Sequence, residues 1–286
     1  MSYILSKDQT RLYYVVNRAS AEESEPSSTG ALIVHGFGDH CQRYDQVAAH
    51  LNELGVDVFR FDYRGHGRSE GKRGHIASFN EYLEDLSAAI DAFNDQLGSS
   101  KKILLAHSNG GLIATHALSL LPDLKTWSGA ILSSPFYAIK VAVPWWKRFM
   151  GSKLSAVFPT LQIPTDLDPS HMSHDPAVVD SYGSDPLIGR VASARWFTEI
   201  LNAHDEVSKH LQEIEVPLLF QLAGDDLVAD SDYTEALING LQLPHVELKR
   251  YPDLYHEIWF EDPSINRKVF ADLDHFVHTL VESPFE

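Results

Sequence analysis

The run Lys102-Ile103-Leu104-Leu105-Ala106-His107-Ser108-Asn109-Gly110-Gly111 decides the fold. Its apolar first half has the length of a buried strand, and the apolar run that continues to Leu118 is compatible with a helix. This pattern predicts a strand, a tight turn and a helix, with Ser108 at the apex of the turn. In the motif G-x-S-x-G, small flanking residues hold such a serine on a strained corner, and the following helix N-terminus points positive charge toward it. Ala106 stands where the motif has its first glycine, so the match is incomplete by one methyl group.

Strands and helices alternate along most of the 286 residues. The expected strands cover residues 3–5, 12–16, 31–35, 57–62, 102–106, 129–133, 217–222 and 246–250. The expected helices cover residues 44–54, 79–93, 110–120, 233–238 and 266–281. Alternation of this kind predicts an α/β fold in which a mostly parallel sheet is covered by helices on both faces.

The alternation breaks between residues 136 and 205, directly after the sixth expected strand. A structureless loop of that length is improbable inside a compact domain, so we expect a helical insertion, here called the cap, that packs over the sheet. Residues 1–135 and 206–286 then form the core, and residues 136–205 form the cap. The cap contains large apolar side chains at Trp145, Trp146, Phe149, Met150 and Phe158. They either form a small core of the cap itself or make a surface that binds apolar material.

The composition disfavours several classes of function. A net charge of −17 argues against binding to nucleic acid and against electrostatic docking on anionic lipid. Cys41 is the single cysteine, so no disulfide forms within the chain, which suits a reducing compartment. The first eight residues lack the basic and apolar segments of a signal peptide, and no apolar stretch approaches the ~20 residues of a membrane span. We therefore expect a soluble, cytoplasmic protein.

A serine hydroxyl is a weak nucleophile that needs a base within hydrogen-bond reach and an acid to orient that base. In doubly wound sheets such groups gather at the carboxyl ends of the strands. Asp225 and Asp226 follow the expected strand at 217–222, and His256 follows the one at 246–250. Serine, acid and histidine therefore come in the order typical of a nucleophile-elbow hydrolase. On this ground alone the two adjacent aspartates remain alternatives.

A second signal is the segment His35-Gly36-Phe37-Gly38-Asp39-His40 at the end of an early strand. Its glycines allow backbone N–H groups to turn inward, where one of them can stabilise a developing oxyanion together with the amide after the nucleophile. We expect these two donors to be the N–H groups of Phe37 and Asn109.

These motifs resemble those of the monoacylglycerol lipases and the related lysophospholipases. The similar segments are residues 35–40 with Arg43-Tyr44, residues 62–75, Phe79-x-x-Tyr82-x-x-Asp85 and Asp185-Pro186-Leu187. The resemblance implies the α/β-hydrolase fold with Ser108, Asp226 and His256 as its catalytic triad. In that family the acid is followed, four and five residues later, by Asp and a small polar residue. Asp230 and Ser231 stand at those distances from Asp226, so the resemblance selects Asp226 as the acid. It also implies a serine ester hydrolase that cleaves the acyl ester of a monoacylglycerol or lysophospholipid without a metal or other cofactor.

For a lipid substrate the apolar residues of the cap have two candidate roles. They line a tunnel for the acyl chain, or they touch a membrane so that a lipid can enter, which would make the protein peripheral at membranes. Two other classes of function stay open, because function resides in the site rather than in the fold. One is another α/β-hydrolase chemistry on small esters or peptides, and the other is a non-catalytic binding protein.

Two further motifs are interpreted as structural. The glycines of the loop at residues 64–69 satisfy backbone turns, and we expect Asp62 and Arg64 to pair locally there. His171 and His174 are two histidines without further ligands nearby in the sequence, so we do not expect them to bind a metal.

Overall fold

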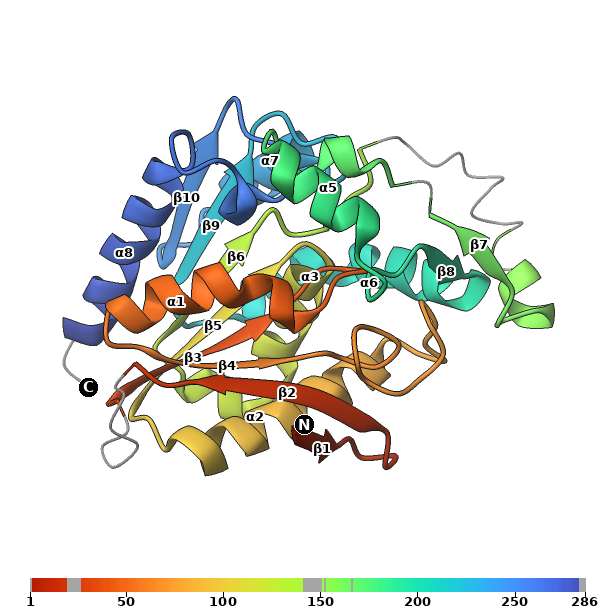
Figure 1. Ribbon diagram of the computed structural model, residues 1–286, viewed down its shortest axis with the longest axis horizontal. Helices are drawn as coiled ribbons and strands as arrows, with labels where there is room; N and C mark the ends of the chain where they lie inside the picture. Colours follow the sequence, from red (N-terminus) through yellow and green to blue (C-terminus); the bar gives the residue numbers. More distant parts are fainter. Residues whose placement is uncertain (1, 20–26, 141–150, 152, 166, 283–286) are drawn as a thin grey trace.

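The computed structural model describes residues 2–19, 27–140, 151, 153–165 and 167–282. An eight-stranded sheet runs through its centre in the order β1-β2-β4-β3-β5-β6-β9-β10 (Figure 1). β2 is antiparallel to both of its neighbours, whereas the other neighbouring strands are parallel. The bounds of the strands are β1 Ser2–Leu5, β2 Arg11–Asn17, β3 Thr29–Val34, β4 Asp57–Phe61, β5 Lys101–His107, β6 Gly129–Ser133, β9 Leu218–Ala223 and β10 Val246–Tyr251.

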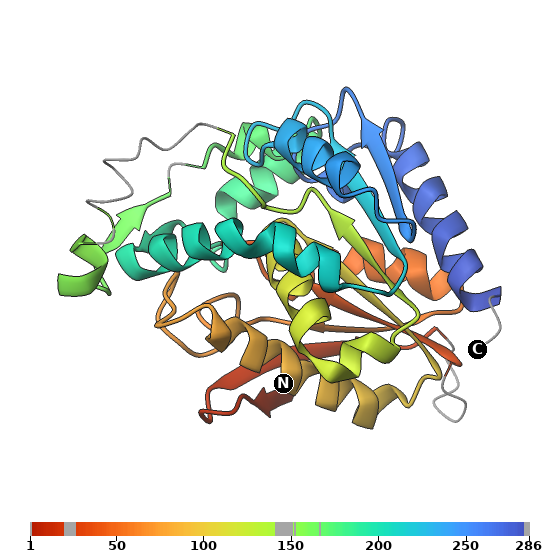
Figure 2. The same cartoon turned by 180° about the vertical axis from the view of Figure 1, so that it is seen from behind.

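Helices cover both faces of this sheet. One face carries α1 (Asp45–Glu53) and α8 (Arg267–Glu282), and the other carries α2 (Asn80–Leu97), α3 (Asn109–Leu120) and α6 (Ala194–Glu213), as Figures 1 and 2 show from opposite sides. Each face has its own apolar core. Leu32 and Ile33 of β3 belong to opposite cores, because successive side chains of a strand point to opposite faces.

The central strands are apolar along their whole length because helices bury them from both sides. Every residue of β3, β6 and β9 is buried. The expected strands and helices of the core are confirmed, with small shifts at their ends. The largest shift is at the helix expected over residues 79–93, because α2 continues to Leu97. The helix expected over residues 233–238, α7, runs over Ser231–Leu241. Short 3₁₀ turns complete the core at Cys41–Tyr44, Pro122–Thr126 and Ile258–Phe260.

The carboxyl ends of the parallel strands lie level along one edge of the sheet. Val34 of β3 pairs with Ala106 of β5, which pairs with Leu132 of β6, which in turn pairs with Phe220 of β9. The loops that follow these strands therefore open on the same rim. The expected triad and oxyanion residues follow strands at this rim, which is where ligands bind in open α/β sheets.

The inserted segment contains more than helices. It holds α5 (Pro176–Ser184), the 3₁₀ turn Pro169–His171 and a two-stranded antiparallel sheet of β7 (Gln162–Pro164) and β8 (Val191–Ser193). This small sheet is absent from the strands expected from the sequence. α6 begins directly after β8 and continues to Glu213, so the limit expected at residue 205 falls inside one continuous helix. The division into core and cap stays a prediction.

The loop at residues 64–69 is structural, but the expected pairing of Asp62 with Arg64 is wrong. Arg64 binds the buried carboxylate of Asp85 on α2 through Nε at 2.9 Å and Nη2 at 2.7 Å, and it also reaches Asp8. Asp62 instead accepts hydrogen bonds from the backbone N–H groups of Cys41 and Arg68. Arg64 therefore ties the loop to α2 and to the turn after β1. None of the helices in the described ranges is long and apolar enough to cross a membrane.

Candidate active site

Ser108 lies at the sharp corner between β5 and α3. Its backbone has φ 54° and ψ −120°, and a positive φ strains a residue that carries a side chain. The N–H of Ser108 donates to the carbonyl of Ser133 at 2.9 Å, and its own carbonyl accepts from the N–H of Phe136 at 3.0 Å. Ala106 is fully buried in the apolar core, so the methyl group that replaces the first glycine of the motif is accommodated. The predicted corner is therefore present.

Gly110 allows α3 to begin against the end of β3. A Cβ atom at this position would lie 2.4 Å from the carbonyl oxygen of Val34 and 2.5 Å from that of His35. Only glycine permits this approach, because both obstacles are backbone atoms that no rotamer can move away. The approach sets Asn109 beside the loop that follows β3.

Ser108, His256 and Asp226 form a continuous hydrogen-bonded line. Oγ of Ser108 lies 2.9 Å from Nε2 of His256, and Nδ1 of His256 lies 2.8 Å from Oδ2 of Asp226. Oδ1 of Asp226 accepts from the N–H groups of Val228 and Ala229, which fixes the carboxylate. With Nδ1 donating to Asp226, the lone pair of His256 faces Ser108. Of the two candidate acids, Asp226 is buried against the histidine and Asp225 is exposed.

The electrostatics suit a histidine base. Burial by itself would lower the pKa of His256, but the Asp226 carboxylate, with smaller contributions from Glu257 and Asp39, outweighs burial and raises the pKa above its ordinary value of 6.5. His107 also lines the site, with its ring centroid 4.9 Å from that of His256. Burial and the neighbouring His256 push the pKa of His107 well below its ordinary value. A positive charge is therefore favoured on His256 rather than on His107.

The peptide group between Gly36 and Phe37 is held firmly at the edge of the site. The Tyr63 hydroxyl donates to the carbonyl of Gly36 at 2.7 Å, and Nδ1 of His35 lies 2.7 Å from the same oxygen. Nδ2 of Asn109 donates to the Tyr63 hydroxyl at 3.2 Å. Tyr63 thus bridges the two segments that carry the expected oxyanion donors. The donor roles of Phe37 and Asn109 stay a prediction, and sequence reasoning did not find Tyr63.

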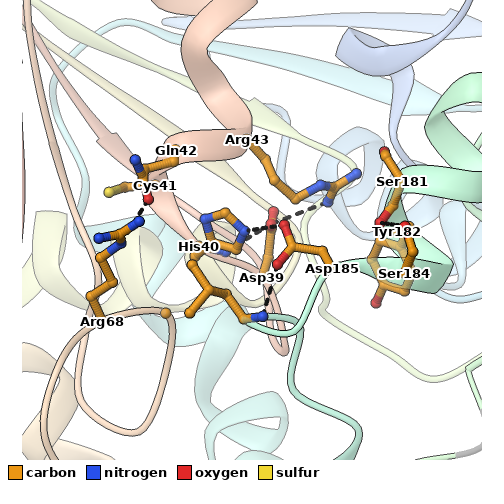
Figure 3. A network of polar contacts seen from close by, with 12 residues as sticks. Asp39, His40, Cys41, Gln42, Arg43, Arg68, Ser181, Tyr182, Ser184 and Asp185 are labelled. Atoms are coloured by element: carbon orange, nitrogen blue, oxygen red, sulfur yellow. Dashed lines mark hydrogen bonds and ion pairs between the residues drawn. The ribbon is translucent and has the colours of Figure 1, made fainter.

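A polar network connects the loop after β3 with the inserted segment (Figure 3) and, through Arg43, with the loop that carries His256. Arg43 binds both carboxylate oxygens of Glu257, at 2.7 and 2.6 Å, and also contacts Asp39 at 3.1 Å. Although burial opposes ionisation, Arg43 lowers the pKa of Asp39 to about 2. His40 faces Asp185, with Nε2 2.9 Å from Oδ2. In the sequence Arg43 and Asp185 were only landmarks of a resemblance, and their partners could not be foreseen.

A pocket of about 450 Å³ opens above Ser108 and His256. This volume falls within the range of small-molecule sites, roughly 300–1,000 Å³. Its walls are mainly apolar, and they include Phe136, Met172, Trp196, Phe197, Ile200 and Val228. Of the five cap residues singled out from the sequence, only Phe158 belongs to the described residues. Its side chain is 59% exposed and is not part of the pocket wall. Trp145, Trp146, Phe149 and Met150 lie outside the described residues.

The two histidines of the inserted segment, His171 and His174, lie in different environments. Nδ1 of His174 lies 2.9 Å from Oε1 of Glu261, and the His174 ring stacks on Tyr255 with centroids 3.6 Å apart. His171 ends a 3₁₀ turn.

Comparison with known proteins agrees with this geometry. Residues 27–263 match the family described as "Serine aminopeptidase, S33". The monoglyceride lipase of Rattus norvegicus is 30% identical over 258 residues, which are 88% of this chain and 84% of the relative. The probable lysophospholipase L2 of Haemophilus influenzae is 26% identical and covers 86% of this chain and 83% of its own. The crystal structure of a monoacylglycerol lipase from Paleococcus ferrophilus superposes with a TM-score of 0.81 at 27% identity, over 94% of this chain and 99% of that one. Because the matched region takes in the serine corner, the loop before it and both strand-end partners, the chain belongs to the serine aminopeptidase S33 family of α/β-hydrolases.

Proposed function

We propose that the protein is a serine ester hydrolase that cleaves the acyl ester of a single-chain lipid, a monoacylglycerol or lysophospholipid. The observation that carries this proposal is the hydrogen-bonded line of Ser108, His256 and Asp226 at the floor of an apolar pocket. The relatives named as lipases and a lysophospholipase support the substrate class.

The reaction takes place in two stages. Ser108 Oγ attacks the ester carbonyl while Nε2 of His256 accepts the hydroxyl proton, and His256 then returns that proton to the leaving alcohol. Water repeats the sequence on the acyl-enzyme and releases the fatty acid. Asp226 holds the imidazole in its tautomer and stabilises the imidazolium. The N–H groups of Phe37 and Asn109 stabilise the oxyanion, and one such donor typically contributes 10²–10³ in kcat.

The pocket favours a lipid over a peptide with a free amino terminus. An aminopeptidase site needs a carboxylate that is available to bind the substrate's α-ammonium group. Within the described part of the wall the acidic residues are Asp39 and Glu257, and Arg43 binds both of them. An acyl chain, in contrast, gains about 0.8 kcal/mol for each methylene group that it buries against such apolar walls.

The inserted segment also carries an exposed apolar face near the pocket. Val157, Phe158, Leu161 and Ile163 are 46–68% exposed, and Ile163 lines the pocket as well. We propose that this face rests on lipid surfaces, so that the protein associates peripherally with membranes. With neutral lipid vesicles, we expect Phe158→Asp to sediment less than the wild type and to keep its activity on dispersed short-chain esters. Equal sedimentation of the two proteins would contradict the contact.

The central experiment replaces Ser108 by alanine and uses Ser264→Ala, in an exposed loop, as the matched control. We expect Ser108→Ala to lose labelling by a fluorophosphonate probe and to hydrolyse long-chain monoacylglycerol and short p-nitrophenyl esters at least 10³-fold more slowly. Ser264→Ala should behave as the wild type. Wild-type protein that fails to label and to hydrolyse either ester would favour a binding protein. Peptide hydrolysis without ester hydrolysis would favour a peptidase.

A further inference from the structure

A cluster of histidine and glutamate lies between α3 and α6, away from the candidate active site. His116 on α3 and His210 on α6 are both buried, with ring centroids 4.2 Å apart. Glu206 precedes His210 by one helical turn, and its Oε2 lies 3.8 Å from Nε2 of His210. One ligand atom from each of His116, Glu206 and His210 falls within 4.8 Å of the other two. The cluster thus joins the helix that begins at the serine corner to the helix that carries part of the pocket wall.

The hydrogen bonds of His116 settle which of its ring nitrogens has a lone pair. Nε2 of His116 lies 3.1 Å from the carbonyl oxygen of Ala203. A carbonyl can only accept, so Nε2 carries the proton and Nδ1 has the free lone pair.

The same reasoning applies to His210 through two further residues. Nδ1 of His210 lies 2.9 Å from Oγ of Ser119, and this hydroxyl is already committed to donating to Oε2 of Glu213 at 2.5 Å. Ser119 must then accept from His210, so Nδ1 of His210 carries the proton. The lone pair is on Nε2, the atom that faces Glu206.

We propose that His116, His210 and Glu206 bind one divalent ion of the zinc class, which clamps α6 onto α3. Two imidazoles and a carboxylate with an open fourth position are a donor set that zinc uses. In zinc sites the ligating histidines commonly donate their second ring N–H to a backbone carbonyl or, through hydrogen bonds, to a carboxylate. Ala203 provides that partner for His116, and the Ser119–Glu213 pair provides it for His210.

The ligand atoms must draw together for the ion to bind. Zinc–ligand bonds of about 2.0–2.2 Å require tetrahedral ligands closer to one another than the atoms of this cluster now lie. Glu206 can supply this movement, because its side chain is 66% exposed. The two histidines, in contrast, are buried between α3 and α6. The role assigned to the ion is structural, since the cluster does not line the pocket.

The experiment uses full-length protein without a histidine tag, freed of metal by a chelator. Titration with Co²⁺ should give the visible absorption of a tetrahedral site with one equivalent per chain, and Zn²⁺ should displace it. At a free zinc concentration about 100 times Kd, Tm should rise by about 5 °C. These readouts do not depend on activity, so they stand even if the proposed ester hydrolysis fails.

The variants separate this site from adventitious binding. Glu206→Gln alters an exposed side chain and should fold normally, yet it should lower zinc affinity at least tenfold, as should His116→Gln. Glu213→Gln should lower zinc affinity about 10–100-fold, because Glu213 supports the second ring nitrogen of His210 through Ser119. His174→Gln, which removes the histidine paired with Glu261, is the matched control and should bind like the wild type. The proposal is overturned if no one-to-one cobalt spectrum appears, or if Glu206→Gln binds zinc as tightly as the wild type. If His116→Gln does not fold, the zinc affinities of Glu206→Gln and Glu213→Gln decide the question.

Discussion

Replacing Gly110 by alanine tests whether the close approach of α3 to β3 sets the oxyanion geometry. The added Cβ would meet the Val34 carbonyl oxygen at 2.4 Å, whereas ordinary contact begins at 3.4 Å, so the two segments must separate by about 1 Å. A displacement of this size at a reacting group can cost about 10²-fold in rate. Overpacking of the core adds about 1–3 kcal/mol of destabilisation. We therefore expect kcat to fall about 10²-fold while the protein still folds.

The assay is hydrolysis of a short-chain p-nitrophenyl ester, which needs little of the pocket, together with thermal unfolding. Gly240→Ala is the matched control, because Gly240 lies near the end of α7 and a Cβ there would meet nothing within 4 Å. That variant should keep full activity and lose no stability. If Gly110→Ala keeps more than half of the wild-type kcat, the distance between Asn109 and the loop after β3 does not control the rate, and the reasoning is refuted.

Three further predictions concern the surroundings of the serine. Because the pKa of His256 is raised and the neutral imidazole is the base, kcat/KM should fall with decreasing pH along a limb centred above pH 6.5. In Asp226→Asn that limb should move to lower pH and kcat should fall by about 10⁴, and a limb that does not move would show that Asp226 is not the cause of the shift. Tyr63→Phe removes the donor to the Gly36 carbonyl, so kcat should fall about tenfold with little change in KM. A rise in KM as large as the fall in kcat would argue against a role in oxyanion positioning. Arg43→Ala leaves the buried carboxylates of Asp39 and Glu257 unpaired and should cost about 3–5 kcal/mol in urea unfolding. The control Arg250→Ala breaks more exposed pairs and should cost under about 1 kcal/mol; equal losses in the two variants would contradict the argument.

The core of the fold could be predicted because its signals are local. Buried parallel strands have continuous apolar sequences, and the serine, acid and histidine each follow such a strand directly. The order of these residues along the chain and their shared rim then bring them together. Asp226 could be separated from Asp225 only through the resemblance, because adjacent residues give the same strand-end signal.

Contacts that depend on tertiary placement could not be read from the sequence. Arg43 meets Glu257 across 214 residues, and nothing near either of them indicates the other. The expected pairing of Arg64 with Asp62 favoured sequence proximity, whereas the folded chain brings Asp85 of α2 to the guanidinium. The continuity of α6 across residue 205 was hidden for a related reason. Its apolar face changes partners along its length, from the pocket to the sheet, so no composition boundary marks the change.

That continuity constrains how the protein can change its substrate range. Twenty residues of helix make a rod of about 30 Å, in which Trp196 and Ile200 line the pocket and Val207 and Leu211 are buried in the apolar core. The position of this wall is therefore set by residues that are buried in the apolar core. Evolution or engineering can change the size of the pocket by exchanging side chains along α6. Inserting or deleting one residue in the helix would instead rotate every later buried residue by about 100° and disrupt its packing in the core.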